Sequence, residues 1–364
     1  SQDYTKTAAQ GYLLQAMGEL LWDSRAHTLE GHDALVTLAL GELAELRAVD
    51  DRVIGGGPAF GLNRAWDAFG DGTENPAFTA YTWQSGSVAL GVAKLPRYLA
   101  HIDHPEAEAV RDYGVVLVSY WLPFYTAADD GGWYWYSDRP ADAIAVHNTS
   151  ALIAMAGEIL SELGADQALS RRARACADLL WARMRGNPEM GYTWNYADDG
   201  FPQARRRPED ISHAIITLQL MRMAGDRGWW GANRMLGVSR TLTRHVWSGN
   251  PARLNGYVDG SSARDSDWTY TRAAMAGYAV HGDTPGGDPL VYEHARSILF
   301  SSYMSRFDRR LQTASVSAVQ SLTIAMLLTR RPAALAHGSH WIRVAGPGDD
   351  ARPEAPGGVR FYHV

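Results

Sequence analysis

Residues 142–163 read DAIAVHNTSALIAMAGEILSEL, a polar segment that leads directly into a long apolar helix. The same arrangement recurs in EDISH at 209–213 and in RDSDWTY at 264–270, with about 60 residues between successive copies. Each copy places His, Asn, Asp, Glu or Arg in the first turns of a helix that soon becomes apolar. The repetition predicts a ring of helical hairpins in which the same ends of several inner helices face one cleft.

Apolar residues recur at helical spacing through most of the chain. Pro140 and Pro208 suit the first turn of a helix, and Gly164 and Gly228 suit the position after the last turn. The predicted helices span about 4–24, 30–50, 77–102, 105–123, 140–163, 166–185, 208–225, 229–247, 265–281, 287–304 and 311–331. Short links alternate with long loops, which are predicted at about 51–76, 124–139, 186–207 and 248–264.

This alternation is typical of an all-α fold, an (α/α)n toroid or incomplete barrel of helical hairpins with n of about 5–7. A stacked helical solenoid is the main rival, although its repeats are usually more uniform. Hydrophobic residues make up 46% of the 364 residues, enough for one large core. No segment resembles a linker, so we expect a single domain over residues 1–364 with an irregular tail from about residue 337.

Composition and motifs exclude several classes of function. A net charge of −6 argues against a general nucleic-acid binder, and no apolar run reaches the roughly 18 residues that span a bilayer. The single Cys176 excludes a disulfide framework, and HExxH, Walker, GxGxxG and GxSxG motifs are absent. Loop acids at Asp71, Asp129–Asp130 and Asp198–Asp199 match no EF-hand, so we expect no metal and no cofactor. The oligomeric state stays open.

The chain contains 13 Trp and 17 Tyr residues, many of them in Gly-flanked segments such as GWYWY at 132–136 and GYTWNY at 191–196. Such rings either fill gaps between helices or stack against the C–H faces of sugars. As a group, beside Asp and Asn, they favour a carbohydrate substrate. The candidates for substrate contact are Trp133, Trp135, Tyr192, Trp194, Tyr196 and Trp268, together with Gln84 from the helix predicted at 77–102.

The first polar segment offers an imidazole and an amide side by side. His147 and Asn148 are expected about two turns into the helix predicted at 140–163. Neighbouring helical residues point about 100° apart, so both can border a cleft at a helix end without sharing a face. They are either interior polar residues satisfied by nearby loops, or groups that contact a substrate carboxylate.

The second segment combines two carboxylates with an imidazole. Glu209 and His213 are spaced i,i+4 and Asp210 and His213 i,i+3, so either acid can orient the ring and fix its tautomer. Alternatively, both acids simply complement the N-terminus of the helix. Glu209 is also a candidate for substrate contact. Arg206 is another if the run 205–207 faces the cleft; otherwise that run belongs to a solvated loop.

The third segment pairs a guanidinium with a phenol. Arg264 and Tyr270 are close enough in sequence to reach one pocket if Arg264 lies in the loop. A nearby cation favours the phenolate, and a tyrosine prepared in this way can remove a proton and later donate one. The alternative is a surface Arg/Asp network beside a core tyrosine.

The chain resembles polysaccharide lyases of the (α/α)-toroid type, particularly those acting on glucuronan or alginate, in three motifs: His147–Asn148, EDISH at 209–213, and Arg264 followed by Tyr270. The resemblance implies β-elimination in a uronate-containing, anionic polysaccharide. Asn148, with His147 or His213, would neutralise the uronate carboxylate. Tyr270, assisted by Arg264, would serve as base and acid. The reserve candidates for the catalytic phenol are Tyr192 and Tyr196.

Three alternatives stay open. An inverting glycoside hydrolase on an (α/α)-barrel would use two carboxylates about 6.5–9.5 Å apart. Asp129 or Asp130, with Glu209 or Asp210, are the candidates for such a pair. A uronate C5-epimerase shares the proton-abstraction step, and a non-enzymatic carbohydrate-binding protein would need only the aromatic residues. The substrate class and the absence of an initial Met favour a secreted or periplasmic protein.

Overall fold

The computed structural model describes residues 4–22, 32–53, 59–198, 207–250, 254–261, 288 and 290–300, with the isolated positions 325 and 329. The α-helices are α1 (Tyr4–Trp22), α2 (His32–Val53), α3 (Thr82–Lys94), α4 (Pro96–His101), α5 (Ala107–Ser119), α6 (His147–Glu162), α7 (Gln167–Arg183), α8 (Ile211–Asp226), α9 (Ala232–Arg240) and α11 (Leu290–Phe300). The helices predicted at 265–281 and 311–331 (positions 325 and 329 apart) and the tail lie outside the described residues. Among the described helices, none is long and apolar enough to cross a membrane.

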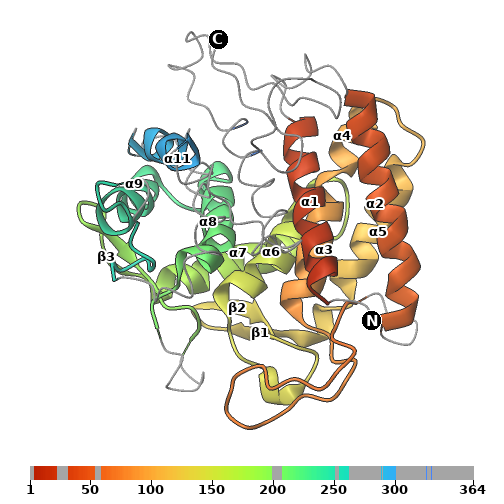
Figure 1. Ribbon diagram of the computed structural model, residues 1–364, viewed down its shortest axis with the longest axis horizontal. Helices are drawn as coiled ribbons and strands as arrows, with labels where there is room; N and C mark the ends of the chain where they lie inside the picture. Colours follow the sequence, from red (N-terminus) through yellow and green to blue (C-terminus); the bar gives the residue numbers. More distant parts are fainter. Residues whose placement is uncertain are drawn as a thin grey trace, which may run out of the picture.

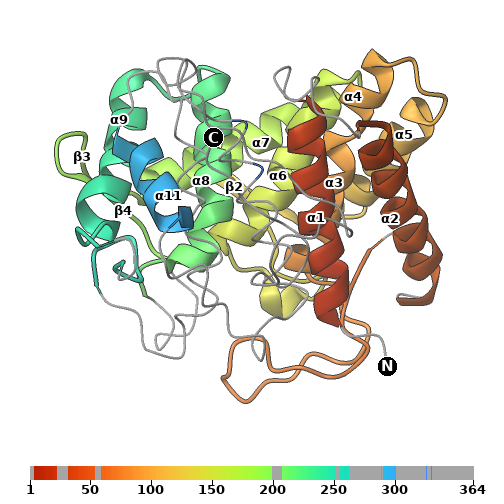
Figure 2. The same ribbon diagram turned by 45° about the horizontal axis from the view of Figure 1, so that its top comes forward.

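The helices form an inner and an outer layer, which confirms the predicted (α/α) toroid (Figures 1 and 2). In the inner layer α1 packs on α3, α3 on α6, and α6 on α8. The outer helices α2, α5, α7 and α9 each pack against an inner one. Nearly every residue of α3 and α6 is buried, whereas α5 buries a single stripe. This difference is expected because an inner helix is covered on all sides and an outer helix on one.

Glycines allow α1 and α3 to approach each other closely. A Cβ atom at Gly11 would lie 2.5 Å from the carbonyl carbon of Ser87, and one at Gly91 would lie 2.7 Å from the carbonyl oxygen of Gly11. Real Cβ atoms do not approach other atoms so closely, so a larger residue at either position would push the two helices apart. The small side chains therefore fix the spacing of the inner layer.

Each inner helix begins beside the loop that leads into the next inner helix. Isolated antiparallel bridges make this connection three times, joining Tyr81 to Ser137, Val146 to Ala197, and Asp210 to Tyr257. The starts of α3, α6 and α8 are thereby held at the same end of the ring. We call this end the N-terminal pole; in Figure 1 it is the lower side, where β1 and β2 also lie.

Short hairpins and turns occupy the long loops. The first hairpin pairs β1 (Tyr125–Ala128) with β2 (Gly131–Tyr134), and the second pairs β3 (Arg185–Asn187) with β4 (Gly191–Thr193), both antiparallel. The remaining short elements are the 3-10 helices η2 (Leu122–Phe124) and η3 (Pro140–Asp142) and the π-helical turn η5 (Thr241–Val246). The sequence predicts the two hairpins as loops, because strands of three or four residues carry too little alternation to be recognised. The turns η3 and η5 instead fall within the helices predicted at 140–163 and 229–247.

The helix predicted at 77–102 is interrupted and begins later. Phe78 has a φ of 66°, a left-handed conformation that no helix continues through, and α3 starts only at Thr82. At the other end α3 stops at Lys94, and Pro96 opens the separate helix α4. Proline lacks the backbone N–H that a continuous helix would need at this position, so the chain turns here.

Candidate functional site

Asp210 is fixed at the start of α8 by several hydrogen bonds. It is the N-cap residue, and its Oδ1 accepts from the backbone N–H groups of Ser212 and His213 at 3.1 and 3.3 Å. The Ser212 hydroxyl donates to the same oxygen. Burial by itself would raise the pKa of this carboxyl, but His213, Ser212 and Arg207 together hold the pKa well below its usual range. Asp210 is therefore ionised at neutral pH.

His213 presents a ring nitrogen at the N-terminal pole. Its Nδ1 lies 2.7 Å from Oδ2 of Asp210, and 39% of its side chain is exposed. The ring of Tyr196 packs edge-on against the imidazole, with 5.1 Å between ring centroids. Burial lowers the pKa of His213, but the charge and hydrogen bond of Asp210 outweigh it and raise the pKa above its ordinary value. A proton shared between Nδ1 and Asp210 leaves Nε2 for a substrate.

Glu209 does not share a face with His213, because it precedes the N-cap and its side chain turns into the core. It is fully buried: Trp194 donates its Nε1–H to Oε2, and the Thr217 hydroxyl donates to Oε1 at 2.9 Å. Burial raises the pKa of Glu209 to about 8. The sequence predicted Glu209 as a substrate contact or a partner of the imidazole; in the structure it anchors the Trp194 ring instead.

The helix predicted at 140–163 begins one loop later than expected. Pro140 opens only the short helix η3, and the chain stays extended up to Val146, which bridges to Ala197. His147 and Asn148 are therefore the first two residues of α6, not residues two turns into a helix. Because the bridge sets where α6 starts, both side chains lie at the N-terminal pole.

An ion-pair chain connects His147 to the hairpin β1–β2. His147 Nε2 lies 3.6 Å from Oδ1 of Asp198, and Nε of Arg183 donates to both oxygens of that carboxylate at 2.8 and 2.9 Å. A terminal nitrogen of Arg183 pairs with Asp130. Burial raises the pKa of Asp198, but His147 and Arg183 bring the pKa below its usual range. The Arg183 guanidinium thus joins two loop acids from different segments of the chain, Asp130 and Asp198.

Asn148 has an unused polar atom. The residue is only 2% exposed, and its Oδ1 has no hydrogen-bond partner among the residues that the structure describes. The two atoms of an amide are assigned from their hydrogen bonds, so a flipped side chain would offer its NH₂ group there instead. Either orientation leaves a buried amide group that a ligand can satisfy.

The aromatic candidates divide into surface and core residues. Trp133 and Trp135 are half-buried; their Nε1–H groups donate to the carbonyl oxygen of Ala143 at 3.3 Å and to the Thr126 hydroxyl at 2.8 Å. Tyr196 is also half-buried. These three rings retain exposed surface for stacking. The candidates that lie in the core are Tyr192, Trp194 and Gln84.

Four candidates lie outside the described residues: Arg206, Arg264, Trp268 and Tyr270. Two further residues complete the surroundings of Asp210. Arg207 lies 3.6 Å from the carboxylate of Asp210 and donates to the Tyr257 hydroxyl at 3.2 Å. Arg207 belongs to the run 205–207 considered above, and Tyr257 follows Gly256, as other loop aromatic residues of this chain follow a glycine. In the described part of the chain, no three or more His, Cys, Asp or Glu side chains are grouped to hold a metal ion.

Comparison with known proteins identifies the fold. No family model and no curated protein matches the sequence. A GH76A α-1,6-mannanase from Salegentibacter sp. HEL1_6 matches the structure with a TM-score of 0.54 and 11% identity, over 90% of this chain and 99% of the mannanase. A reducing-end-xylose releasing exo-oligoxylanase matches with a TM-score of 0.55 and 12% identity, over 88% of this chain and 81% of its own.

A D-mannose isomerase also matches, with a TM-score of 0.54 and 12% identity over 87% of each chain. The ring of α/α hairpins is thus the fold of glycoside hydrolases and of a sugar isomerase. Identities this low establish the architecture and leave the activity to be argued from the site.

Proposed function

We propose that this chain is a carbohydrate-active enzyme that hydrolyses glycosidic bonds in a polysaccharide at its N-terminal pole. The observation that carries the proposal is the Asp210–His213 pair, in which a buried carboxylate holds a partly exposed imidazole at 2.7 Å. A histidine held in this way is a general acid–base group whose orientation and tautomer are set in advance. A polymeric substrate would place the enzyme outside the cytoplasm.

The direction of the His213 pKa favours an acid over a base. Because the pKa is raised, the imidazolium form is more populated at neutral pH than for an ordinary histidine. Hydrolysis needs a group that protonates the leaving glycosidic oxygen, and imidazolium Nε2 fits that role. Elimination at a uronate C5 instead needs a base that removes a proton. A raised pKa is less favourable for that role, because it reduces the fraction of His213 that is deprotonated at neutral pH.

Asp198 is the base that we assign to the hydrolysis. Its pKa is lowered, so it is ionised at neutral pH, and it lies in the loop between β4 and α8, next to Ala197, which bridges to Val146 at the start of α6. A carboxylate has about four lone-pair positions, so one that accepts from Arg183 can still accept from a water molecule. The half-buried rings of Trp133, Trp135 and Tyr196 would stack on sugar units. The mannanase and the oligoxylanase on the same fold support this choice of reaction.

A second candidate is β-elimination in a uronate polymer such as glucuronan or alginate. The unpartnered position at the Asn148 amide favours it, because a flipped amide would place its NH₂ group there and elimination requires a donor that neutralises the uronate carboxylate. Deprotonated His213 or Tyr270 would then be the base. A C5-epimerase would use the same groups without breaking the glycosidic bond.

One experiment separates these reactions. The protein is incubated with α-mannan, xylan, glucuronan and alginate, while reducing ends and the absorbance of a C4–C5 double bond are both followed. Hydrolysis gives new reducing ends without the absorbance change, and elimination gives both. His213→Gln should abolish the activity, and His104→Gln, on an exposed connection far along the chain, serves as the matched control. Full activity in His213→Gln would overturn the assignment of the site. Polysaccharide binding without turnover would instead favour a binding protein.

A further inference from the structure

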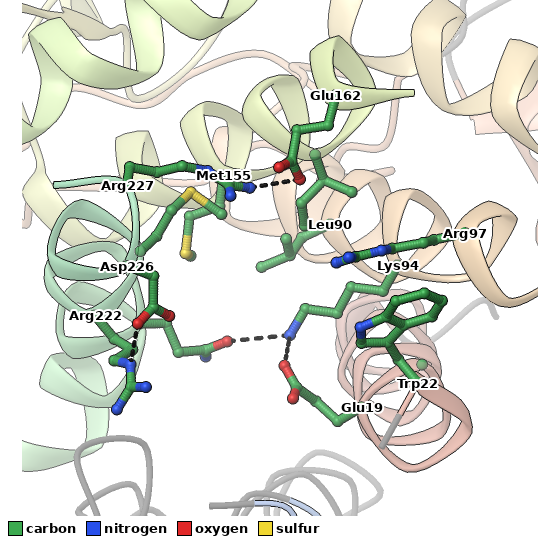
Figure 3. Close-up of a pocket in the computed structure, with 14 residues that line it drawn as sticks. Glu19, Trp22, Leu90, Lys94, Arg97, Met155, Glu162, Arg222, Asp226 and Arg227 are labelled. Atoms are coloured by element: carbon green, nitrogen blue, oxygen red, sulfur yellow. Dashed lines mark hydrogen bonds and ion pairs between the residues drawn. The ribbon is translucent and has the colours of Figure 1, made fainter. Parts of the chain in front are cut away.

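A cavity lies at the end of the ring opposite the N-terminal pole, where the inner helices end. The last residues of α1, α3, α6 and α8 all line it: Trp22, Lys94, Glu162 and Asp226 (Figure 3). We call this end the C-terminal pole. The 16 residues of α6 separate it from His147 by roughly 24 Å along the helix. The cavity is therefore distinct from the site at the N-terminal pole.

The rim of this cavity carries charged side chains that neutralise one another. Four cationic and three carboxylate side chains occur among its described lining residues. Most are paired, in the contacts Lys94–Glu19 (2.5 Å), Arg222–Asp226 (2.8 Å) and Arg227–Glu162 (2.5 Å). A rim with nearly balanced charge has no strong preference for an anion or a cation. It does offer many hydrogen-bond donors and acceptors in fixed positions.

Gln219 offers a buried hydrogen-bond donor to the cavity. Its side chain lines the cavity, and the residue is only 6% exposed. The amide oxygen accepts from Nζ of Lys94 at 3.4 Å, but Nε2 has no hydrogen-bond partner among the residues that the structure describes. An unsatisfied buried donor costs about 1–3 kcal/mol, so a ligand that supplies an acceptor here would be favoured.

Apolar groups form the floor and one side of the cavity. Leu90 and Met155 lie between the charged pairs, and Trp22 stands at the edge with 39% of its surface exposed (Figure 3). The guanidinium of Arg97 lies 3.8 Å from the centre of the Trp22 ring, which holds the indole in place. An apolar floor beside an aromatic ring, enclosed by polar groups, complements a molecule with one C–H face and a rim of hydroxyl groups.

We propose that the cavity at the C-terminal pole binds one neutral sugar unit. Hydroxyl groups both donate and accept, so they can satisfy Gln219 Nε2 and the charged pairs together without adding charge. The cavity volume is about 250 Å³. It lies just below the roughly 300–1,000 Å³ of pockets for drug-sized ligands, which suits a single sugar unit better than a chain. The proposal is independent of the reaction at the N-terminal pole.

Methionine methyl groups provide a local readout of binding. Met155 and Met223 line the cavity, whereas Met190 is exposed on the hairpin β3–β4. In protein labelled with ¹³C at the methionine methyl groups, D-mannose or D-xylose should shift the Met155 and Met223 signals in a saturable manner. Met190 reports any general effect of the solvent. The titration extends to roughly 100 mM, because a single sugar unit is expected to bind in the millimolar range.

Two variants test the contacts that the proposal requires. Trp22→Ala should abolish the saturable shifts, and Gln219→Leu should weaken binding roughly tenfold, the effect of one hydrogen bond. Trp133→Ala removes a comparable ring at the N-terminal pole and should leave these shifts unchanged. Gln219→Leu replaces a buried amide by an apolar group of similar size, so the fold is expected to tolerate it.

Three results would overturn the proposal. The first is the absence of saturable shifts with both neutral sugars. The second is binding that survives Trp22→Ala and Gln219→Leu unchanged. The third is a response to D-glucuronate alone that added salt removes, because this would identify an anion site held by the arginines of the rim.

Discussion

Replacing Asp210 by Asn removes one negative charge from beside the His213 imidazole and keeps a cap on α8. Asn is about as good an N-cap residue as Asp, and its side-chain oxygen can still accept from the backbone N–H groups of Ser212 and His213. The charged contact of 2.7 Å between the carboxylate and Nδ1 becomes a neutral hydrogen bond. The variant therefore separates the electrostatic role of Asp210 from its structural role.

The expected change is large for the pKa of His213 and small for stability. An opposite charge within about 4–6 Å shifts a pKa by about 1–3 units, so the pKa of His213 should fall by at least about 1 unit in Asp210→Asn. One pKa unit corresponds to about 1.4 kcal/mol of unfolding free energy, and because 39% of the His213 side chain is exposed, solvent screening should keep the loss near that value.

The pH dependence of that stability loss has a defined sign. The pKa of His213 is raised in the folded protein. Its contribution to the unfolding free energy is therefore full below the unfolded-state pKa near 6.5 and is lost as the pH rises through the folded-state pKa. The pKa of Asp210 is lowered, so its contribution is full above the unfolded value of 3.8 and is lost as the pH falls through the folded one. Asp210→Asn should therefore destabilise most between about pH 4 and 6.5.

The measurement is an NMR titration of the imidazole signals in the wild type, in Asp210→Asn and in Asp178→Asn. Asp178 is an exposed acid on α7 and serves as the control. The alkaline limb of the activity–pH profile should shift to lower pH by the same amount as the pKa of His213, since the acid form is the active one. A His213 pKa that stays within a few tenths of the wild-type value in Asp210→Asn would refute the reasoning.

Three further predictions concern the rest of the structure. The pKa of Glu209 is raised to about 8, so the wild type loses stability as the pH rises from the unfolded pKa of 4.5. Glu209→Gln lacks this titration, so the difference between its unfolding free energies at pH 5 and pH 8, from thermal melts, should be smaller than that of the wild type by at least about 1.4 kcal/mol. Arg183→Met should raise the pKa of Asp198 and lower kcat, because Asp198 loses the guanidinium that holds it. The exposed control Arg174→Met should leave kcat unchanged, and equal rates in the two variants would contradict the role of Arg183. Gly91→Ala should lower the unfolding free energy by about 1–3 kcal/mol in urea unfolding, because its Cβ would clash with α1. Gly41 has open space around it, so Gly41→Ala should instead raise the unfolding free energy by up to about 1 kcal/mol, because Ala is the better helix former.

The helical ring could be predicted because its signals are local. Apolar spacing identified most described helices to within a few residues, and the alternation of short and long connections indicated an inner and an outer layer. The errors fall at helix starts. Pro140 is followed by a 3-10 turn, and α6 begins at His147 only because Val146 bridges to Ala197, about 50 residues later.

The roles within the EDISH segment illustrate the same division. Helical spacing allowed either Glu209 or Asp210 to orient His213, and the sequence offered no means of choosing. The structure pairs Asp210 with the imidazole, since Asp210 is the N-cap and Glu209 turns towards Trp194. Trp194, the partner of Glu209 in the core, precedes it by 15 residues, so the spacing within the EDISH segment cannot reveal this contact.

The sequence by itself determined the all-α class, the layering of the helices and the presence of polar groups at the starts of inner helices, because each depends on residues within one or two turns of one another. Only the tertiary structure decided which carboxylate meets which imidazole, and that the ends of four inner helices enclose a polar cavity. Both depend on contacts between segments far apart in the chain, such as Lys94 with Gln219. The free energy of such contacts comes from burial and charge pairing in the assembled ring, which no local spacing records.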